Sequence, residues 1–227
     1  MSQINGVVIG LVTKVDDPNK QGRVKVHFPW LADNHESDWI RVATMMGGNG
    51  RGSFFMPEVK DEVLIAFDHG DARFPYVVGF MWNGKDKPPN DDINTSVRRL
   101  QTVSGHLLEF DDNKDSQHIR IKTKGGHRLV LDDKSGSAKI ELFDQQGQNT
   151  LLIDTAKNAI EITSQQGSIT LKAPAGTIKL DALNLELAAQ AKATMNAKAS
   201  LELSGTASAK IESSGVLTAS GSIIKLN

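Results

Sequence analysis

The sequence predicts an all-β protein, in which a small closed barrel is followed by a long β-structure that several chains build together. Large side chains gather at one end of the chain: all three Trp, the only Tyr and six of the eight Phe lie before residue 85. At the other end, the odd positions from 183 to 211 carry no polar side chain, while the even positions are polar except Ala188. Large side chains fill a globular core, and period two places alternate residues on one face of a strand.

The first 85 residues are expected to form five short strands, each rich in β-branched or aromatic residues and bounded by turn formers. Gly47–Gly50 is expected to be a wide loop that hosts neither helix nor strand. Five short strands without a clear helix favour an OB-fold barrel. The strands are Gly6–Val15, Arg23–Phe28, Asp38–Thr44, Glu62–Phe67 and Tyr76–Trp82.

The composition changes sharply after the barrel. Lys85–Asn94, with the sequence KDKPPNDDIN, is rich in turn formers and is typical of a linker. Beyond it the chain is rich in Ala, Ser, Thr and Lys, which cannot fill a globular core. The sequence therefore predicts an OB-fold barrel over residues 1–84, a linker or neck over 85–101 and a repetitive β-helix shaft over 102–227.

A short repeat opens the predicted shaft. His106–Asp112 is echoed 21 residues later by His127–Asp133, and more loosely by Asn149–Thr155. Alternating strands lie between the copies, at His118–Lys122 and Lys139–Leu142. Each unit is therefore a strand, an acidic turn and a strand, which indicates a stacked β array.

The alternation over 183–211 also predicts how the shaft is held together. A helix is the competing interpretation, because Ala, Leu, Lys, Glu and Gln favour helices, but a helical stripe needs steps of three and four residues. An isolated strand is unstable in water, and unpaired β edges aggregate, so the apolar face must pack near an axis shared with other chains. An intertwined trimeric β-helix meets both demands, although the pattern alone does not give the number three. The expected core residues are Leu183, Leu185, Leu187, Met195, Leu201, Leu203 and Ile211.

Composition excludes several classes of function. The formal net charge of −1 gives no basic field for nucleic acid or anionic lipid. The chain has no cysteine, so disulfides and thiolate metal sites are excluded. No stretch has the roughly 18 apolar residues of a membrane helix, and the N-terminus lacks the features of a secretory signal.

The six histidines are His27, His35, His69, His106, His118 and His127. His35-Glu36 has no second His at helical spacing, which excludes a zincin-type metal site. His69, between Asp68 and Asp71, suggests an acid–base or metal pair, but a polar hairpin turn is favoured. His106 and His127 share a repeat position, where copies around an axis would bind an ion; a repeated turn residue is favoured. No metal and no cofactor are therefore expected.

The carboxylate pairs are expected to lie in solvated turns rather than across a hydrolase cleft. Ser53 lies in neither a nucleophile elbow nor a P-loop, so no catalytic residue is expected. A cell-wall hydrolase and a nucleic-acid-binding barrel remain the alternative functions; the second rests on the basic residues of Arg23–His27, which alternation places on the outside. The pairs are Asp16-Asp17, Asp91-Asp92, Asp111-Asp112 and Asp132-Asp133.

Seven segments between Gly6 and Pro89 occur in an order that resembles the OB-fold segment of VgrG proteins and phage baseplate assembly protein V. Leu31, Ala72 and Met45-Met46 depart from the family pattern, which leaves loop details open but not the fold. The segments are Asp17-Pro18, Gly22–Val26, Phe28–Trp30, Trp39–Ala43, Asp61–Phe67, Gly70–Gly79 and Asn83–Pro89.

The resemblance implies the central spike of a contractile injection machine, which pierces the target cell envelope and carries a tip protein and effectors, in a short form without the hub module. It implies a homotrimer, separate hub or baseplate proteins at the barrel, transient contact with a target membrane, and no nucleic acid. Assembly is expected in the cytoplasm, into a phage tail-like particle. No His follows His127, so the His-x-His tip iron site of some spikes is not expected. A PAAR-type tip protein is expected to contact Ile223, Ile224, Lys225, Leu226 and Asn227.

Overall fold

The computed structural model describes residues 3–31, 35–89 and 93–225. The chain separates into two units, Met1–Thr170 and Leu171–Asn227. Within the described ranges the regular elements are all β-strands apart from one 3-10 turn, η1 (Asp68–Gly70). None of the described residues belongs to a helix with the length and apolar character needed to span a membrane.

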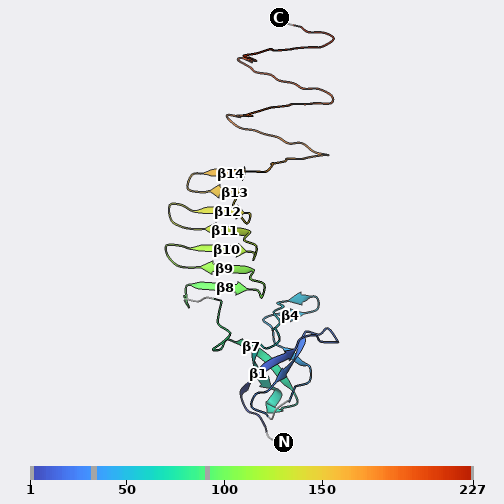
Figure 1. The fold of residues 1–227 in the computed structure, drawn as a ribbon, viewed down its shortest axis with the longest axis vertical. Coiled ribbons are helices and arrows are strands. Elements are labelled where there is room, and N and C mark those ends of the chain that lie inside the picture. The colour runs from blue at the N-terminus through green and yellow to red at the C-terminus, as the bar shows by residue number, and fades with distance from the viewer. Residues whose placement is uncertain (1–2, 32–34, 90–92, 226–227) are drawn as a thin grey trace. The chain divides into compact units, whose positions relative to one another are not determined.

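A closed barrel with the strand order β1-β2-β3-β7-β6 forms the N-terminal domain (Figure 1). All five strands expected from the sequence are confirmed, with differences only at their ends. The barrel strands are β1 (Val7–Lys14), β2 (Arg23–His27), β3 (Ile40–Val42), β6 (Glu62–Phe67) and β7 (Pro75–Met81). Inward-facing residues of these strands build the core, which consists of Val12, Val24, Val26, Phe28, Ile40, Val63, Ile65 and Val77.

A small ribbon, separate from the barrel sheet, lies between β3 and β6. It consists of β4 (Gly47–Gly48) and β5 (Arg51–Gly52), which pair antiparallel. The expectation that the Gly-rich stretch hosts no strand is therefore wrong. Glycine permits the pairing, because Gly52 has a φ of 145° and a Cβ there would lie 2.4 Å from the Met46 carbonyl oxygen.

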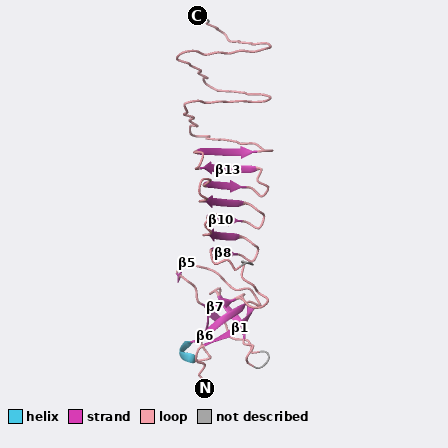
Figure 2. Ribbon diagram, turned by 90° about the vertical axis from the view of Figure 1, so that its left-hand side faces the viewer, coloured by secondary structure: helices cyan, strands magenta, loops and turns pink. Residues whose placement is uncertain are grey.

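A seven-stranded antiparallel sheet follows, in which the strands lie side by side in chain order from β8 to β14 (Figure 2). The three repeat copies become β9, β11 and β13, and the alternating strands between them become β10 and β12, as the repeat predicts. The strands are β8 (Val97–Gln101), β9 (Leu107–Asp111), β10 (His118–Lys122), β11 (Arg128–Asp132), β12 (Lys139–Phe143), β13 (Asn149–Asp154) and β14 (Ala159–Ser164).

The two edge strands of this sheet were not expected from the sequence. β8 lies inside the range 85–101 assigned to the linker, because its segment VRRLQ has no apolar alternation and becomes a strand by pairing with β9. Every pairing in the sheet joins neighbouring strands of the same chain. The five inner strands, β9 to β13, therefore have both edges paired within the chain.

The second unit is a zigzag of extended segments (Figure 1). No helix and no strand is assigned to residues 171–225. The helical alternative for 183–211 is thus absent, and the expected strands find no partner within the chain. Leu183, the first residue of the apolar alternation, is 98% exposed.

Candidate functional site

One side of the seven-stranded sheet carries two columns of apolar side chains that cross its strands. Residues directly opposite each other in neighbouring strands lie on the same side of a sheet, so the register defines each column. We call this side the apolar face. Its first column is Leu100, Leu108, Ile121, Leu129, Leu142, Leu151 and Ile162, and its second is Phe110, Ile119, Leu131, Ile140, Ile153 and Ile160.

No described part of the chain covers the apolar face. Ile121 and Leu142 in the middle of the sheet are each 49% exposed, and Ile160 of β14 is more exposed still. Each buried methylene contributes about 0.8 kcal/mol, so leaving two columns of branched side chains in water is costly. An apolar surface of this extent marks an interaction site.

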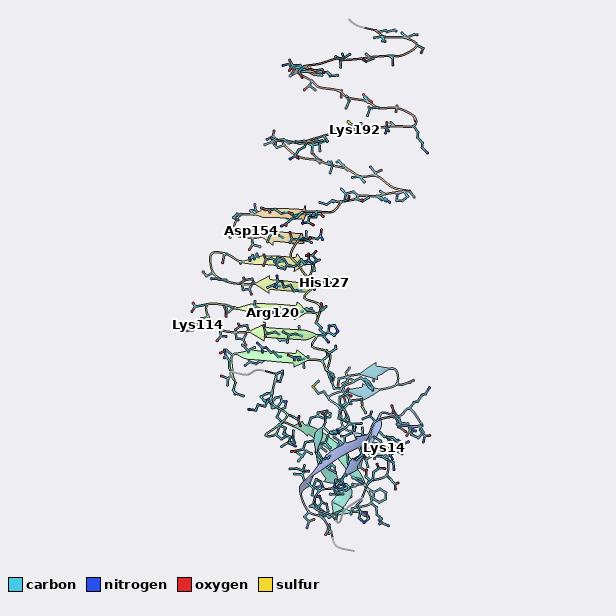
Figure 3. All side chains as sticks on the ribbon, in the orientation of Figure 1. Lys14, Lys114, Arg120, His127, Asp154 and Lys192 are labelled. Atoms are coloured by element: carbon cyan, nitrogen blue, oxygen red, sulfur yellow. The ribbon has the colours of Figure 1, made fainter. Side chains whose placement is uncertain are left out.

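The opposite side of the sheet is mostly polar and holds a cluster that the sequence analysis missed. Glu109 of β9 lies between Arg99 of β8 and Arg120 of β10, and its carboxylate pairs with both guanidinium groups. His118 Nε2 lies 3.2 Å from Glu109 Oε1, and Glu109 is only 2% exposed. Figure 3 shows Arg120 on its strand. Only the strand register brings these residues together, and no local sequence signal gives that register.

The environment of Glu109 sets its protonation state. Burial alone would raise the pKa of Glu109. The hydrogen bond from Arg99, the charge of Arg120 and the hydrogen bond from His118 outweigh burial and hold that pKa below its ordinary value. Arg99 also donates from Nη1 to the carbonyl oxygen of Pro89 at 2.8 Å. The cluster therefore fixes the first three strands of the sheet and ties Pro89 to them.

His106 and His127 occupy equivalent turns. The backbone N–H of His106 donates to Thr102 Oγ1 at 3.0 Å, and that of His127 donates to Thr123 Oγ1 at 3.2 Å. Figure 3 shows His127 and Lys114 at opposite ends of the strands. Both histidines thus close repeated turns, in line with the favoured interpretation.

His69 does not form an acid–base pair with Asp71. Its side chain is exposed, and its Nε2 lies 3.7 Å from Asp68 Oδ1. Asp71 instead accepts hydrogen bonds from Arg73, whose guanidinium lowers the pKa of Asp71 to about 2. Among residues 3–31, 35–89 and 93–225, no group of three or more His, Cys, Asp or Glu residues is placed to hold a metal ion.

One acid of each carboxylate pair within the described ranges closes a turn. Asp17 accepts from the backbone N–H groups of Asn19 and Gln21 and from the Arg23 side chain, which holds the pKa of Asp17 well below its usual range. Asp111 accepts from Asn113 and Ser116 in the turn that it opens. Asp132 accepts from the backbone N–H of Lys134. Asp91 and Asp92 lie outside the described residues.

The basic residues of β2 face outward, as alternation predicts, while Val24 and Val26 are buried. Arg23 pairs with Asp17 at 2.7 Å, and Lys25 Nζ lies 3.3 Å from Glu36 Oε1. Both cations therefore have carboxylate partners within the barrel. Ser53, the other candidate considered, bonds through Oγ to Thr44 Oγ1 at 2.6 Å and helps to hold a turn.

The residues expected to form the shaft core and the tip contact lie on the unpaired extended segment. Of the tip residues, Ile223, Ile224 and Lys225 are described and exposed, whereas Leu226 and Asn227 lie outside the described residues. The core candidates are all exposed in the single chain, namely Leu183, Leu185, Leu187, Met195, Leu201, Leu203 and Ile211.

Comparison with known proteins gives two family matches. Residues 8–82 match the type VI secretion system/phage-baseplate injector OB domain, and residues 118–186 match the phage baseplate V C-terminal trimerisation domain. The first match covers the barrel. The second begins at β10 and continues past β14 into the extended segment.

Curated relatives include spike proteins of type VI secretion systems. The chain is 34% identical over 108 residues to VgrG3 of Vibrio cholerae, covering 43% of this chain and 11% of the relative. It is 32% identical over 124 residues to VgrG5 of Pseudomonas aeruginosa, covering 50% of this chain and 16% of the relative. A V. cholerae protein named actin cross-linking toxin VgrG1 is 28% identical over 131 residues, with 52% and 12% covered. The chain thus spans only a small part of each of these relatives.

Proposed function

Because the chain belongs to the family of VgrG proteins and phage baseplate assembly protein V, we propose that three copies form the central spike of a contractile injection machine. The spike transmits the force of contraction and pierces the target envelope. Its task is mechanical: it stays folded under load and performs no chemical step. Its place is a phage tail-like or secretion-system particle assembled in the cytoplasm, with transient contact to the target membrane.

The apolar face of the seven-stranded sheet carries this proposal. Two columns of Leu, Ile and Phe cross the sheet and meet water in the single chain. Three such faces turned towards one axis bury each other, which removes the cost of exposure. The match to a trimerisation domain over residues 118–186 supports the number three.

The extended segment after β14 completes the shaft in a different way. Among the described residues its backbone groups have almost no partners, and its apolar residues recur with period two. Exposed extended strands pair with other chains when their edges are free. We therefore place the intertwined part of the trimeric β-helix here, with small Ala side chains near the axis and the core residues from Leu183 to Ile211 sealing it.

The proposed contacts with partner proteins lie at the C-terminal residues of the shaft and on the barrel. The residues that we propose to contact a PAAR-type tip protein are Ile223, Ile224, Lys225, Leu226 and Asn227. Hub or baseplate proteins contact the barrel. Nucleic acid is not among the proposed partners, since Arg23 and Lys25 of β2 are paired with carboxylates.

The mass of the protein in solution tests the assembly. We expect three times the chain mass of 24.6 kDa by light scattering, independent of dilution over the micromolar range. A stable monomer would overturn the proposal. Zymography on peptidoglycan tests the mechanical role separately, since lysis by the purified protein would assign it an enzymatic one.

A further inference from the structure

Strand β1 of the barrel is apolar on both of its faces. Val8 and Val12 point inward to the barrel core, while Val7 and Ile9 alternate with them and are exposed. A strand whose two faces are both apolar is typical of a strand that is covered on both sides. Within the described part of the barrel, Val7 and Ile9 on the outer side of β1 stay exposed, while Leu11 is half-buried.

The neighbouring strands extend this outer surface. The register places Ile9 opposite Leu64 of β6, and Leu11 opposite Glu62, which in turn lies opposite Met81 of β7. Glu62 is the one charged residue among the described residues that line this shallow depression. We call the surface the outer wall; it consists of Val7, Ile9, Leu11, Trp30, Leu64 and Met81.

The β4–β5 ribbon carries a second exposed apolar set. Met45 is 87% exposed and Phe54 is 80% exposed, and Met46 and Phe55 are exposed beside them. We call Met45, Met46, Phe54 and Phe55 the hairpin set. Arg51 lies at the turn of the same ribbon.

The stem of the ribbon is held in one conformation. The backbone N–H of Ser53 donates to the Met46 carbonyl oxygen at 2.9 Å, and Thr44 Oγ1 donates to the Ser53 carbonyl oxygen at 2.6 Å. The close approach at Gly52 excludes any side chain there. A stem fixed in this way presents four large side chains to solvent at little further loss of conformational entropy on binding.

The geometry points to a second copy of this chain as the occupant: we propose that the hairpin set of one protomer packs on the outer wall of the next, closing a ring of three barrels. A threefold ring requires two different surfaces on each protomer, because each contact joins unlike patches. The outer wall and the hairpin set are two unlike apolar surfaces of the barrel, which also exposes Val78, Phe80 and Trp82 at its β7 side. The charges agree as well, since Glu62 lies in the outer wall and Arg51 beside the hairpin set.

Tethering supplies the remaining argument. The inference rests on the proposed trimer, in which the shaft holds three barrels at high effective concentration. Under that condition a small apolar contact forms that would not hold free barrels together. Arg51 of one copy then lies near Glu62 of the next, at the rim of the contact, where a charge pair fixes orientation more than affinity.

Cross-linking in the full-length chain tests the contact, and the absence of cysteine gives a clean background. The test variant carries Ile9→Cys and Phe54→Cys, both at exposed positions, and is treated with a short bis-maleimide. We expect most chains to become covalent trimers on a denaturing gel. The matched control carries Ala72→Cys and Phe54→Cys, and should stay monomeric on the gel, as should each single variant.

Light scattering before cross-linking separates the two proposals. If the double variant has the mass of a trimer but yields only monomer on the gel, the ring of barrels is wrong and the spike proposal stands. If its mass is that of a monomer, and the unmodified chain is monomeric too, the spike proposal fails first. Covalent dimers from Ile9→Cys alone would place two outer walls face to face and would also overturn the ring.

A charge-reversal pair provides a second readout that does not depend on cysteine geometry. In the cross-linking background, Arg51→Glu should reduce the covalent trimer, and adding Glu62→Arg should restore it. Restoration requires that the two residues meet across chains. A loss that the second substitution does not recover would contradict the contact.

Discussion

Glu109 and Arg120 lie directly opposite each other on β9 and β10, and their charged groups pair on the polar side of the seven-stranded sheet. Arg99 reaches the same carboxylate from β8. A carboxylate that is almost fully buried needs such partners, because burial without them would favour its neutral form. Together the two arginines and Glu109 help to fix the register of β8, β9 and β10, and β8 is the strand of the three that lacks apolar alternation.

Replacing Glu109 should destabilise the sheet. In Glu109→Ala, two guanidinium groups lose their acceptor, and we expect a loss of about 1 to 3 kcal/mol, limited by the partial exposure of both arginines. The midpoint of urea unfolding measures it. Glu161→Ala, an exposed residue of the same polar side, should leave the midpoint nearly unchanged. Equal shifts in the two variants would contradict the role given to Glu109.

The same carboxylate should make stability depend on pH. The folded-state pKa of Glu109 is lowered from its ordinary value of 4.5, so its contribution is present above pH 4.5 and is lost as the pH falls through the lower folded pKa. Unfolding midpoints at several acidic pH values should fall less steeply in Glu109→Gln than in the unmodified protein. Identical slopes would show that the pKa of Glu109 is the same in the folded and the unfolded protein.

Leu185→Asp should prevent assembly of the C-terminal shaft. The variant places one charge per chain on the face that carries the apolar alternation, and an unpaired buried charge is far more costly than the small gain from the Ala-rich contacts around it. Loss of the trimer by light scattering is the expected result. Asn184→Asp adds the same charge at a neighbouring even position and should still form trimers. Assembly of both variants alike would mean that odd positions do not face the axis.

Ile121→Asp tests the apolar face in the seven-stranded sheet. Ile121 is half-exposed in the single chain, so the fold of one sheet should survive, while packing of sheets against each other should be lost. Lys122→Asp reverses a charge on the next residue, which points to the other side, and should leave the mass unchanged. If Ile121→Asp assembles as well as Lys122→Asp, the apolar faces of the three sheets do not pack against each other.

The barrel could be predicted from the sequence because its strands carry strong local patterns and firm turns. The repeat likewise predicted β9, β11 and β13, since each copy pairs apolar alternation with an acidic turn. β8 and the β4–β5 ribbon could not be found, because polar VRRLQ and glycine become strands only through a partner. The Glu109 cluster was missed for the same reason: Arg99, Glu109 and Arg120 are far apart in sequence, and only the register joins them.

In the extended segment the sequence predicted strands that the single chain does not form. Its alternation over 183–211 predicted strands, yet the single chain forms none, because the pattern gives the faces of a strand but not its partner. The apolar residues themselves were identified, and their exposure in the chain agrees with a surface that needs cover.

The change of pairing after Ser164 gives assembly a direction. A chain leaving the ribosome can complete every backbone ladder up to that residue alone, since domains fold as units and the N-terminal ones fold first. In the proposed trimer, the segment beyond Ser164 pairs only after two further chains have joined. Assembly of the proposed trimer would therefore proceed from the barrel towards the C-terminus. The folded sheets would set the register in which the three extended segments pair.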